Sequence, residues 1–147
     1  MYEIITDVEI NGSPKKVWRA LTDFQSYPRW NPVIPSIKGV ASTGQRLKVV
    51  FGRDGSMKMK FSVIVAACVP EREFTWVGQL IFAKVFAGNH YFLIQQLGPD
   101  RSRLVHGEKF LGLLKPLMWI LLSKRNKSAF SEMNNALKTY VEGNTID

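Results

Sequence analysis

The feature that most constrains this chain is an unbroken helical segment near its end, from Pro116 to Glu142. No glycine or proline interrupts the segment after Pro116, and Gly143 follows where glycine favours the end of a helix. A mostly apolar stripe recurs at steps of three and four residues, and it consists of Trp119, Leu122, Asn126, Phe130, Met133, Leu137 and Tyr140. The spacing predicts one helix of about seven turns, whose stripe the rest of the chain has to cover.

The chain ahead of this helix is typical of a sheet with short helices after the first strand. Apolar and polar residues alternate from Tyr2 to Ile10, as in a strand with one wet face. Ser13 and Pro14 favour a helix start, and a rigid aromatic turn from Tyr27 to Pro32 ends that helical region. Further strands are predicted at about Val33 to Val40, Gln45 to Gly52, Met57 to Val69, Glu73 to Leu80, Val85 to Leu97 and Arg101 to Leu111.

Short turns join these strands, so consecutive strands should pair antiparallel. We therefore expect a single α+β domain over residues 1–147, in which a curved antiparallel sheet of about seven strands wraps around the long helix. One strand shows the two faces clearly, with Met57, Met59, Phe61, Val63 and Val65 on one side and Lys58, Lys60 and Ser62 on the other. On the helix, the period predicts that Phe130, Met133 and Leu137 are buried and that Lys127, Glu132 and Lys138 face water.

Four stretches carry a resemblance to a known family. They run from Ile10 to Phe24, from Tyr27 to Pro32, from Gly88 to Phe92 and from His106 to Gly112. In these stretches the chain resembles the SRPBCC superfamily, also described as START-like or helix-grip proteins, and most of all its polyketide cyclase/dehydrase-like branch. The resemblance implies a first strand that lies between the second and the last, and a deep, mostly apolar pocket between the sheet and the last helix. The superfamily includes lipid carriers, hormone and allergen-type binders and cyclases.

Charge and cysteine content limit the kinds of partner, cross-link and location to be expected. The net charge of +8 favours anionic partners, but the cations are scattered apart from Lys124, Arg125 and Lys127, and no nucleic-acid motif accompanies them. The single cysteine, Cys68, excludes disulfides and thiolate metal clusters. The first residues lack the pattern of a signal peptide, so a cytoplasmic location is expected.

Two histidines and one glutamate are the candidates for ligand recognition or acid/base catalysis. If a three-residue turn from Gly98 to Asp100 closes the last hairpin, Leu97 pairs with Arg101, and His90 then lies opposite Glu108 while Phe92 lies opposite His106. All four side chains should share the inner face. Three readings stay open at this point: a His-Glu pair that satisfies itself in the core, a recognition site for a ligand head group, and a general acid/base set of His90, His106 and Glu108.

The pocket lining is predicted from the inner aromatic and polar positions. The candidate ligand-binding residues are Trp30, Phe61, Trp76, His90, Phe92, His106, Glu108, Phe110, Asn126, Phe130 and Met133, with core packing as the alternative for the aromatic ones. The methionines Met57, Met59, Met118 and Met133 are expected as adaptable filler. No metal or cofactor is expected, because the chain has two histidines and neither an HExxH spacing nor a phosphate-binding glycine loop.

The stretch from Leu113 to Leu122 is apolar on nearly every side of its predicted helix. An ordinary buried helix end explains it, and so does transient docking at an anionic membrane surface or a partner, because cations follow at once. Three functions are therefore carried forward. The first is binding or transport of a small hydrophobic or lipid-like ligand. The second is a cyclase/dehydratase-like enzyme for an aromatic or polyketide-type substrate, and the third is an assembly protein that uses the apolar helix start.

Overall fold

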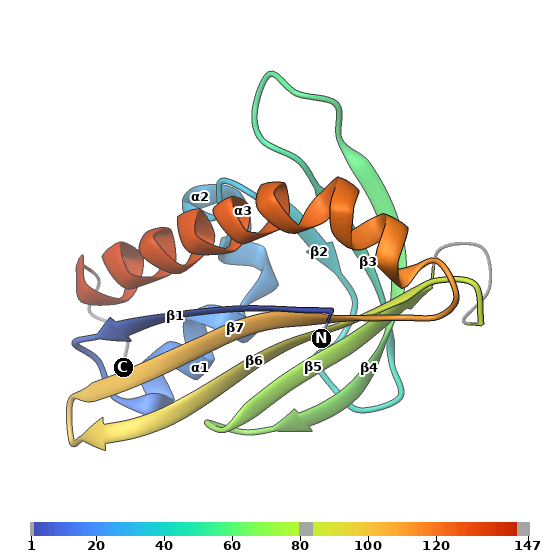
Figure 1. Cartoon of the computed structure of the whole chain (residues 1–147). Coiled ribbons are helices and arrows are strands. Elements are labelled where there is room, and N and C mark those ends of the chain that lie inside the picture. The colour runs from blue at the N-terminus through green and yellow to red at the C-terminus, as the bar shows by residue number, and fades with distance from the viewer. Residues whose placement is uncertain (1, 80–83, 144–147) are drawn as a thin grey trace.

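The computed structural model describes residues 2–79 and 84–143, and it has the α+β helix-grip architecture expected from the sequence. Figure 1 shows α3 lying lengthwise across one face of a curved sheet, with α2 beside it. The strands are β1 Glu3–Ile10, β2 Ser36–Lys38, β3 Arg46–Phe51, β4 Met59–Val69, β5 Glu73–Gln79, β6 Ala87–Gly98 and β7 Arg101–Leu111. The helices are α1 Pro14–Thr22, the 3-10 turn η1 Phe24–Ser26, α2 Tyr27–Trp30 and α3 Lys115–Gly143.

The seven strands form one antiparallel sheet in the order β1-β7-β6-β5-β4-β3-β2. The expectation that the first strand lies between the second and the last is wrong, because β1 pairs with β7 alone among the described strands and lies at an edge. The side of β1 away from β7 meets α3 instead. There the Lys138 amine donates to the Glu9 carbonyl at 2.8 Å, and the Asn11 backbone N–H donates to the Glu142 carboxylate at 2.8 Å.

The short elements between β1 and β3 follow local chemistry. Ser13 caps α1, accepting a hydrogen bond from the Lys16 N–H at 3.3 Å. The predicted aromatic turn is instead the short helix α2, because Pro28 stands in its first turn, where no N–H is needed. β2 is three residues long rather than eight. Pro32 and Pro35 lack the N–H that a longer ladder would require.

The stripe of α3 is buried as predicted along its second half. Phe130, Met133 and Leu137 are buried, and Lys127 is exposed. Glu132 and Lys138 are half-exposed rather than fully in water, because each forms an ion pair, with Arg53 at 2.6 Å and with Glu142 at 2.7 Å respectively. The bond from Arg53 ties the β3–β4 turn to the helix, and Figure 1 shows that turn rising past α3.

The first turns of α3 are not an ordinary buried helix end. Leu117, Ile120 and Leu121 are exposed, and so is Leu113 just before the helix, with Leu113 and Ile120 at 83% and 77%. On the other side of the same turns, Met118, Trp119 and Leu122 pack against Ile4, Phe86, Phe110 and Phe130. The inner face of β4 is also covered only in part. Val63 and Val65 are buried, whereas Met57 is 86% exposed because it precedes the strand.

The last hairpin has the predicted register. His90 pairs with Glu108, and Phe92 pairs with His106. The turn itself differs, because Gly98 pairs with Arg101 and the register shifts by one residue between Gln96 and Gly98. A bulge at Leu97 therefore restores the alignment that a three-residue turn would have produced.

Candidate ligand cavity

A cavity of about 220 Å³ lies between the sheet and the first half of α3. Strands β3 to β7 form its floor and walls, and the helix closes it from above. Most of the lining is apolar. The lining residues are Val49, Phe51, Met59, Phe61, Val63, Trp76, Gly78, Gln79, Phe86, Gly88, His90, Glu108, Phe110, Met118, Leu122, Arg125, Asn126 and Phe130.

Most of the sequence-predicted site residues line this cavity. They are Phe61, Trp76, His90, Glu108, Phe110, Asn126 and Phe130. Met59 and Met118 also line it, as expected for filler. The structure thus brings together aromatic rings from the sheet, two polar groups from the last hairpin and one face of the helix.

Four predicted site residues lie outside the cavity and pack in the core. Trp30 stacks on Tyr140 with ring centroids 5.8 Å apart, near the far end of α3. Phe92 lies against Phe74 and Trp76, and it is fully buried. His106 and Met133 are buried behind the cavity wall. The inward period of a strand or helix does not separate these positions from lining ones, because both kinds face the same way.

A chain of buried hydrogen bonds runs behind the cavity wall. Nε2 of His90 and Nε2 of His106 are 2.8 Å apart, and Nδ1 of His106 is 2.8 Å from Oδ1 of Asn134. Asn134 Nδ2 donates to Thr6 Oγ1 at 2.9 Å, and Thr6 Oγ1 donates to the His106 carbonyl at 2.8 Å. His90 also stacks on Trp76, with centroids 4.7 Å apart and an angle of 8° between the rings. These contacts fix both imidazole rings.

Burial keeps both imidazoles neutral. It lowers the pKa of His106 to about 3, against the opposing effect of hydrogen bonds to Asn134 and the Phe130 backbone. Burial also lowers the pKa of His90 well below its usual value, and the neighbouring His106 adds to this. Placing a charge inside an apolar interior is costly, and two cations side by side would be more so.

Glu108 is the titratable carboxyl that lines the cavity. It forms no hydrogen bond to His90 among the described residues, so the expected close His-Glu pair is absent there. Asn126 Nδ2 donates to Glu108 Oε2 at 3.4 Å, and Gly88 leaves room for Oε1, which a Cβ at that position would strike. Burial raises the pKa of Glu108 to about 7, while the bond from Asn126 acts in the opposite direction. The carboxyl therefore gains or loses a proton near neutral pH.

Several residues of the site escaped the sequence reasoning. Phe51, Phe86 and Gly88 line the cavity, and Asn134 and Thr6 hold the histidines. A signal exists for two of them. Asn134 is a polar residue one turn after Phe130 on the apolar stripe, and Thr6 shares the inward face of β1 with Ile4.

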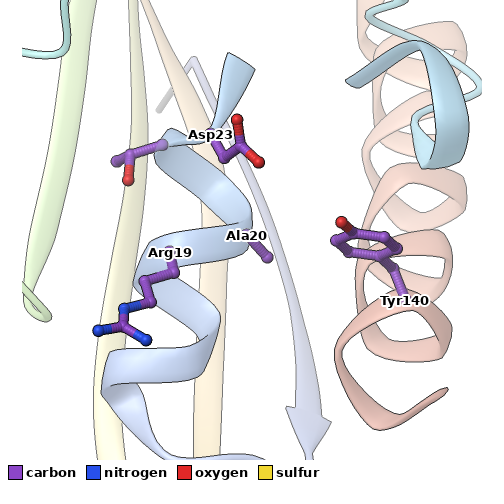
Figure 2. A pocket seen from close by; sticks show the side chains of 5 residues that line it. Arg19, Ala20, Asp23 and Tyr140 are labelled. Atoms are coloured by element: carbon purple, nitrogen blue, oxygen red, sulfur yellow. The ribbon is translucent and has the colours of Figure 1, made fainter. Parts of the chain in front are cut away.

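A second, open cleft of about 390 Å³ lies between α1 and the end of α3, lined by Arg19, Ala20, Thr22, Asp23 and Tyr140. Figure 2 shows the Tyr140 ring reaching from α3 toward Ala20, while Arg19 points away to the other side of α1. The charged groups therefore do not converge. In the apolar cavity the polar groups His90, Glu108 and Asn126 do lie together, so that cavity is the candidate site.

Two absences among the described residues concern metal binding and membrane insertion. Among residues 2–79 and 84–143, no group of three His, Cys, Asp or Glu side chains is placed to hold a metal ion. The helices in that part of the chain include none with the length and apolarity needed to cross a bilayer.

The chain is similar to known proteins in sequence and in fold. A family model described as polyketide cyclase / dehydrase and lipid transport matches residues 1–142. A START superfamily protein of Mycobacterium smegmatis is 22% identical, with a TM-score of 0.76 over 96% of this chain and 97% of that one. A protein of Mesorhizobium loti is 15% identical, with a TM-score of 0.75 over 98% and 99% of the two chains.

A synthase has the same fold. The norcoclaurine synthase of Thalictrum flavum, solved in complex with dopamine and hydroxybenzaldehyde, is 13% identical, with a TM-score of 0.72 over 99% of this chain and 88% of that one. At these identities the likeness to solved structures is one of fold. A comparison with proteins of curated function finds no match.

Proposed function

Because the chain belongs to the polyketide cyclase / dehydrase and lipid transport family, we propose that it binds or carries a small hydrophobic molecule between its sheet and α3. The observation that carries this proposal is a space left open inside an apolar wall. Aromatic side chains such as Phe61, Trp76 and Phe110 surround it, and no described side chain fills it. Such walls bind ligands by removing apolar surface from water.

The size of the cavity limits the ligand. About 220 Å³ is below the range of about 300–1,000 Å³ that is usual for drug-sized ligands. The occupant is therefore a small ring system or a short chain, or a longer molecule whose remainder leaves through the mouth. Gln79 and Arg125 line the cavity and are exposed, so they mark that mouth.

Native mass spectrometry of the protein as purified tests this function. We expect a bound small molecule, and we expect the variant Leu122→Trp to lose it, because Leu122 lines the cavity and a larger ring there fills the space. Ile120→Trp is the matched control, since Ile120 lies on the outer side of the same helix. A molecule retained equally by both variants would contradict binding in this cavity.

A catalytic role is the second candidate, and Glu108 is the observation that favours it. A carboxyl with a pKa of about 7 in an apolar cavity is suited to give and take a proton at neutral pH. His106 lies behind the wall, and burial keeps His90 neutral, so the acid/base set expected from the sequence reduces to Glu108, with His90 beside it. A bound molecule whose mass changes during incubation with the wild type, but not with Glu108→Gln, would support this role.

We further propose that the start of α3 makes transient contact with an anionic membrane surface. The exposed leucines and Ile120 form an apolar outer face, and Lys124 and Lys127 follow within two turns. Met118 and Leu122 on the inner side of the same turns line the cavity. A ligand could then pass between membrane and cavity with little exposure to water. A cytoplasmic location belongs to the same proposal and is supported by the single cysteine.

Vesicle sedimentation tests the membrane contact. Binding should require anionic lipid and weaken with added salt, because exposed charges are screened over about 8 Å at physiological ionic strength. The variant with Lys124→Gln and Lys127→Gln should bind less, whereas Lys15→Gln with Lys16→Gln on α1 should not. Binding that ignores salt and both variants would contradict the contact. A stable dimer that forms through Ile120, with no vesicle binding, would favour an assembly role.

A further inference from the structure

The hydrogen-bond chain behind the cavity has only one consistent arrangement of protons. It starts at Thr6, whose hydroxyl hydrogen goes to the His106 carbonyl, an atom that can only accept. Thr6 Oγ1 must therefore accept from Asn134, which identifies the atom facing Thr6 as the amide nitrogen of Asn134. The amide oxygen then faces Nδ1 of His106. One carbonyl thus determines the orientation of the whole amide.

The same logic fixes both histidine tautomers. An amide oxygen only accepts, so His106 carries its hydrogen on Nδ1, and because burial keeps this ring neutral, its Nε2 holds a lone pair. Nε2 of His90 lies 2.8 Å away and must donate to that lone pair. His90 is neutral as well, so its remaining nitrogen, Nδ1, holds a lone pair.

The lone pair of His90 Nδ1 is available to a ligand. His90 lines the cavity, and the hydrogen bonds of the described residues give its Nδ1 no partner. Stacking on Trp76 holds the ring in place. The cavity wall therefore ends in a rigid hydrogen-bond acceptor, and its orientation is set by Thr6, which lies on another strand.

Glu108 adds a second acceptor beside the first. It is the cross-strand partner of His90 and also lines the cavity. Four other lining groups carry side-chain donors. Asn126 turns an amide hydrogen to Glu108, Arg125 and Gln79 are exposed at the mouth, and the indole N–H of Trp76 belongs to the ring stacked on His90. At His90 Nδ1 and Glu108 the cavity therefore offers lone pairs and, once Glu108 is ionised, a negative charge.

From this geometry we infer that the cavity selects a small apolar molecule that carries a hydroxyl group, an alcohol or a phenol, and rejects one that ends in a carboxylate. The hydroxyl donates to His90 Nδ1, and the apolar remainder lies among Phe61, Phe110 and Trp76. Once Glu108 is ionised, a carboxylate would bring a second negative charge beside it and would meet no donor at His90. This inference rests on the proposed function, because it names the class of ligand for the same cavity.

Calorimetric titration at pH 8 with three matched bicyclic probes tests it. They are 2-naphthol, 2-methylnaphthalene, which replaces the hydroxyl by a methyl group, and 2-naphthoate. The preference for 2-naphthol over 2-methylnaphthalene should be about twofold to tenfold stronger in wild type than in His90→Phe, the range for one hydrogen bond. 2-Naphthoate should not bind wild type measurably, and Glu108→Gln should bind it, because that change removes the charge and adds a donor.

The outcomes separate the two proposals. If the naphthalenes bind but His90→Phe keeps the wild-type preference, the hydroxyl selection is overturned while ligand binding in the cavity stands. Tight binding of 2-naphthoate to wild type would overturn the selection as well. If no probe binds wild type, the proposed function fails for ligands of this size, and the inference fails with it.

A measurement without ligand keeps the inference testable if His90→Phe does not fold. The nitrogen NMR shifts of an imidazole distinguish a protonated ring nitrogen from a bare one. For His90 in the wild-type protein we expect a bare Nδ1 and a protonated Nε2, and for His106 the reverse. A His90 protonated on Nδ1 would overturn the inference, even if every naphthalene bound.

Discussion

The two halves of α3 lie on the same face of the same sheet and differ in what is packed beneath them. Under the second half the space is filled: α1 and α2 contribute Val17, Leu21 and Trp30, and Leu137 is fully buried among them. Under the first half the nearest helix side chains, Leu122 and Asn126, are half-buried and border the cavity. The difference shows that the cavity exists where α1 and α2 no longer reach.

The filled half also supports the empty one. His106 and Asn134 belong to the buried side, yet their hydrogen bonds set the proton positions on His90 at the cavity wall. The ion pair between Arg53 and Glu132 fastens the β3–β4 turn to the middle of the helix. A cavity in this fold thus depends on packing and polar contacts outside its lining.

The largest expected effect separates the two halves by truncation. Leu137→Ala should lower the free energy of unfolding by about 2–5 kcal/mol, because it leaves a void in packed core. Leu122→Ala, on the same stripe but at the cavity, should cost less than about 1 kcal/mol. Urea unfolding of the two variants measures both values. Equal losses would show that the first half of α3 is as tightly packed as the second.

The next effect concerns the border between the halves. Thr6→Val keeps the shape of the side chain but removes the hydroxyl, so the Asn134 amide loses its acceptor and the His106 carbonyl its donor. We expect a loss of about 1–3 kcal/mol in unfolding free energy, the usual cost of an unsatisfied buried polar group. Ser102→Ala does not test the same chain of bonds, because the Ser102 hydroxyl donates to the Gly12 carbonyl. An unfolding free energy that Thr6→Val leaves unchanged would mean that this chain of hydrogen bonds does not stabilise the folded protein.

The pH dependence of stability should have opposite signs for Glu108 at the cavity and for the two buried histidines. The pKa of Glu108 rises from 4.5 to about 7 on folding, so its stabilising effect is complete below pH 4.5 and is lost as the pH rises to about 7. The lowered pKa values of the histidines act in the opposite sense, stabilising above 6.5 and losing this effect as the pH falls. Each group changes stability by up to about 1.4 kcal/mol per pH unit.

Glu108→Gln removes the opposing contribution at the cavity. The variant should therefore lose stability more steeply than wild type between pH 6.5 and 4.5, the ordinary pKa values of histidine and glutamate. Urea unfolding at fixed pH steps gives the slopes. Identical slopes would indicate that Glu108 is already well solvated in the folded protein.

The smallest effect is expected on the outer side of the filled half. Lys138→Met should cost less than about 1 kcal/mol, because partly exposed ion pairs contribute little. Its neighbour Leu137 provides the contrast within one helical turn. If Lys138→Met destabilised the protein as much as Leu137→Ala, the assignment of the buried stripe would be wrong.

The parts of this structure that could be predicted from sequence are those encoded locally. The period of α3 and the antiparallel strands follow from spacing and turns. The pairing of His90 with Glu108 was predicted too, although a bulge at Leu97 and not the assumed turn produces it. The neighbour of β1 did not follow, because strands far apart in sequence carry no local mark of which one they join. The resemblance implied β2 as that neighbour, but β2 is only three residues long and directly follows Pro35.

The sequence predicted which face of the sheet carries the site, but not which residues on that face line the cavity. Sequence placed Phe92 and Phe61 on the inner side alike, but one is core and the other lines the cavity. That distinction depends on how far α1 and α2 extend over the sheet, and the local sequence around Phe61 or Phe92 does not encode this. The partner of His106 depends on the rotation of α3, so Asn134 was missed although Asn126, on the same stripe, was found.

The place of β1 at the rim of the sheet bears on how concentrated protein behaves. An unpaired strand edge is a template on which a second chain can add its own strand, the first step toward aggregates. Here Lys138 occupies the Glu9 carbonyl and Glu142 occupies the Asn11 N–H, so the last turns of α3 guard that edge. The opposite rim, β2, offers only three residues to such an addition. Loosening the end of α3 would therefore expose a self-association surface before the core itself opened.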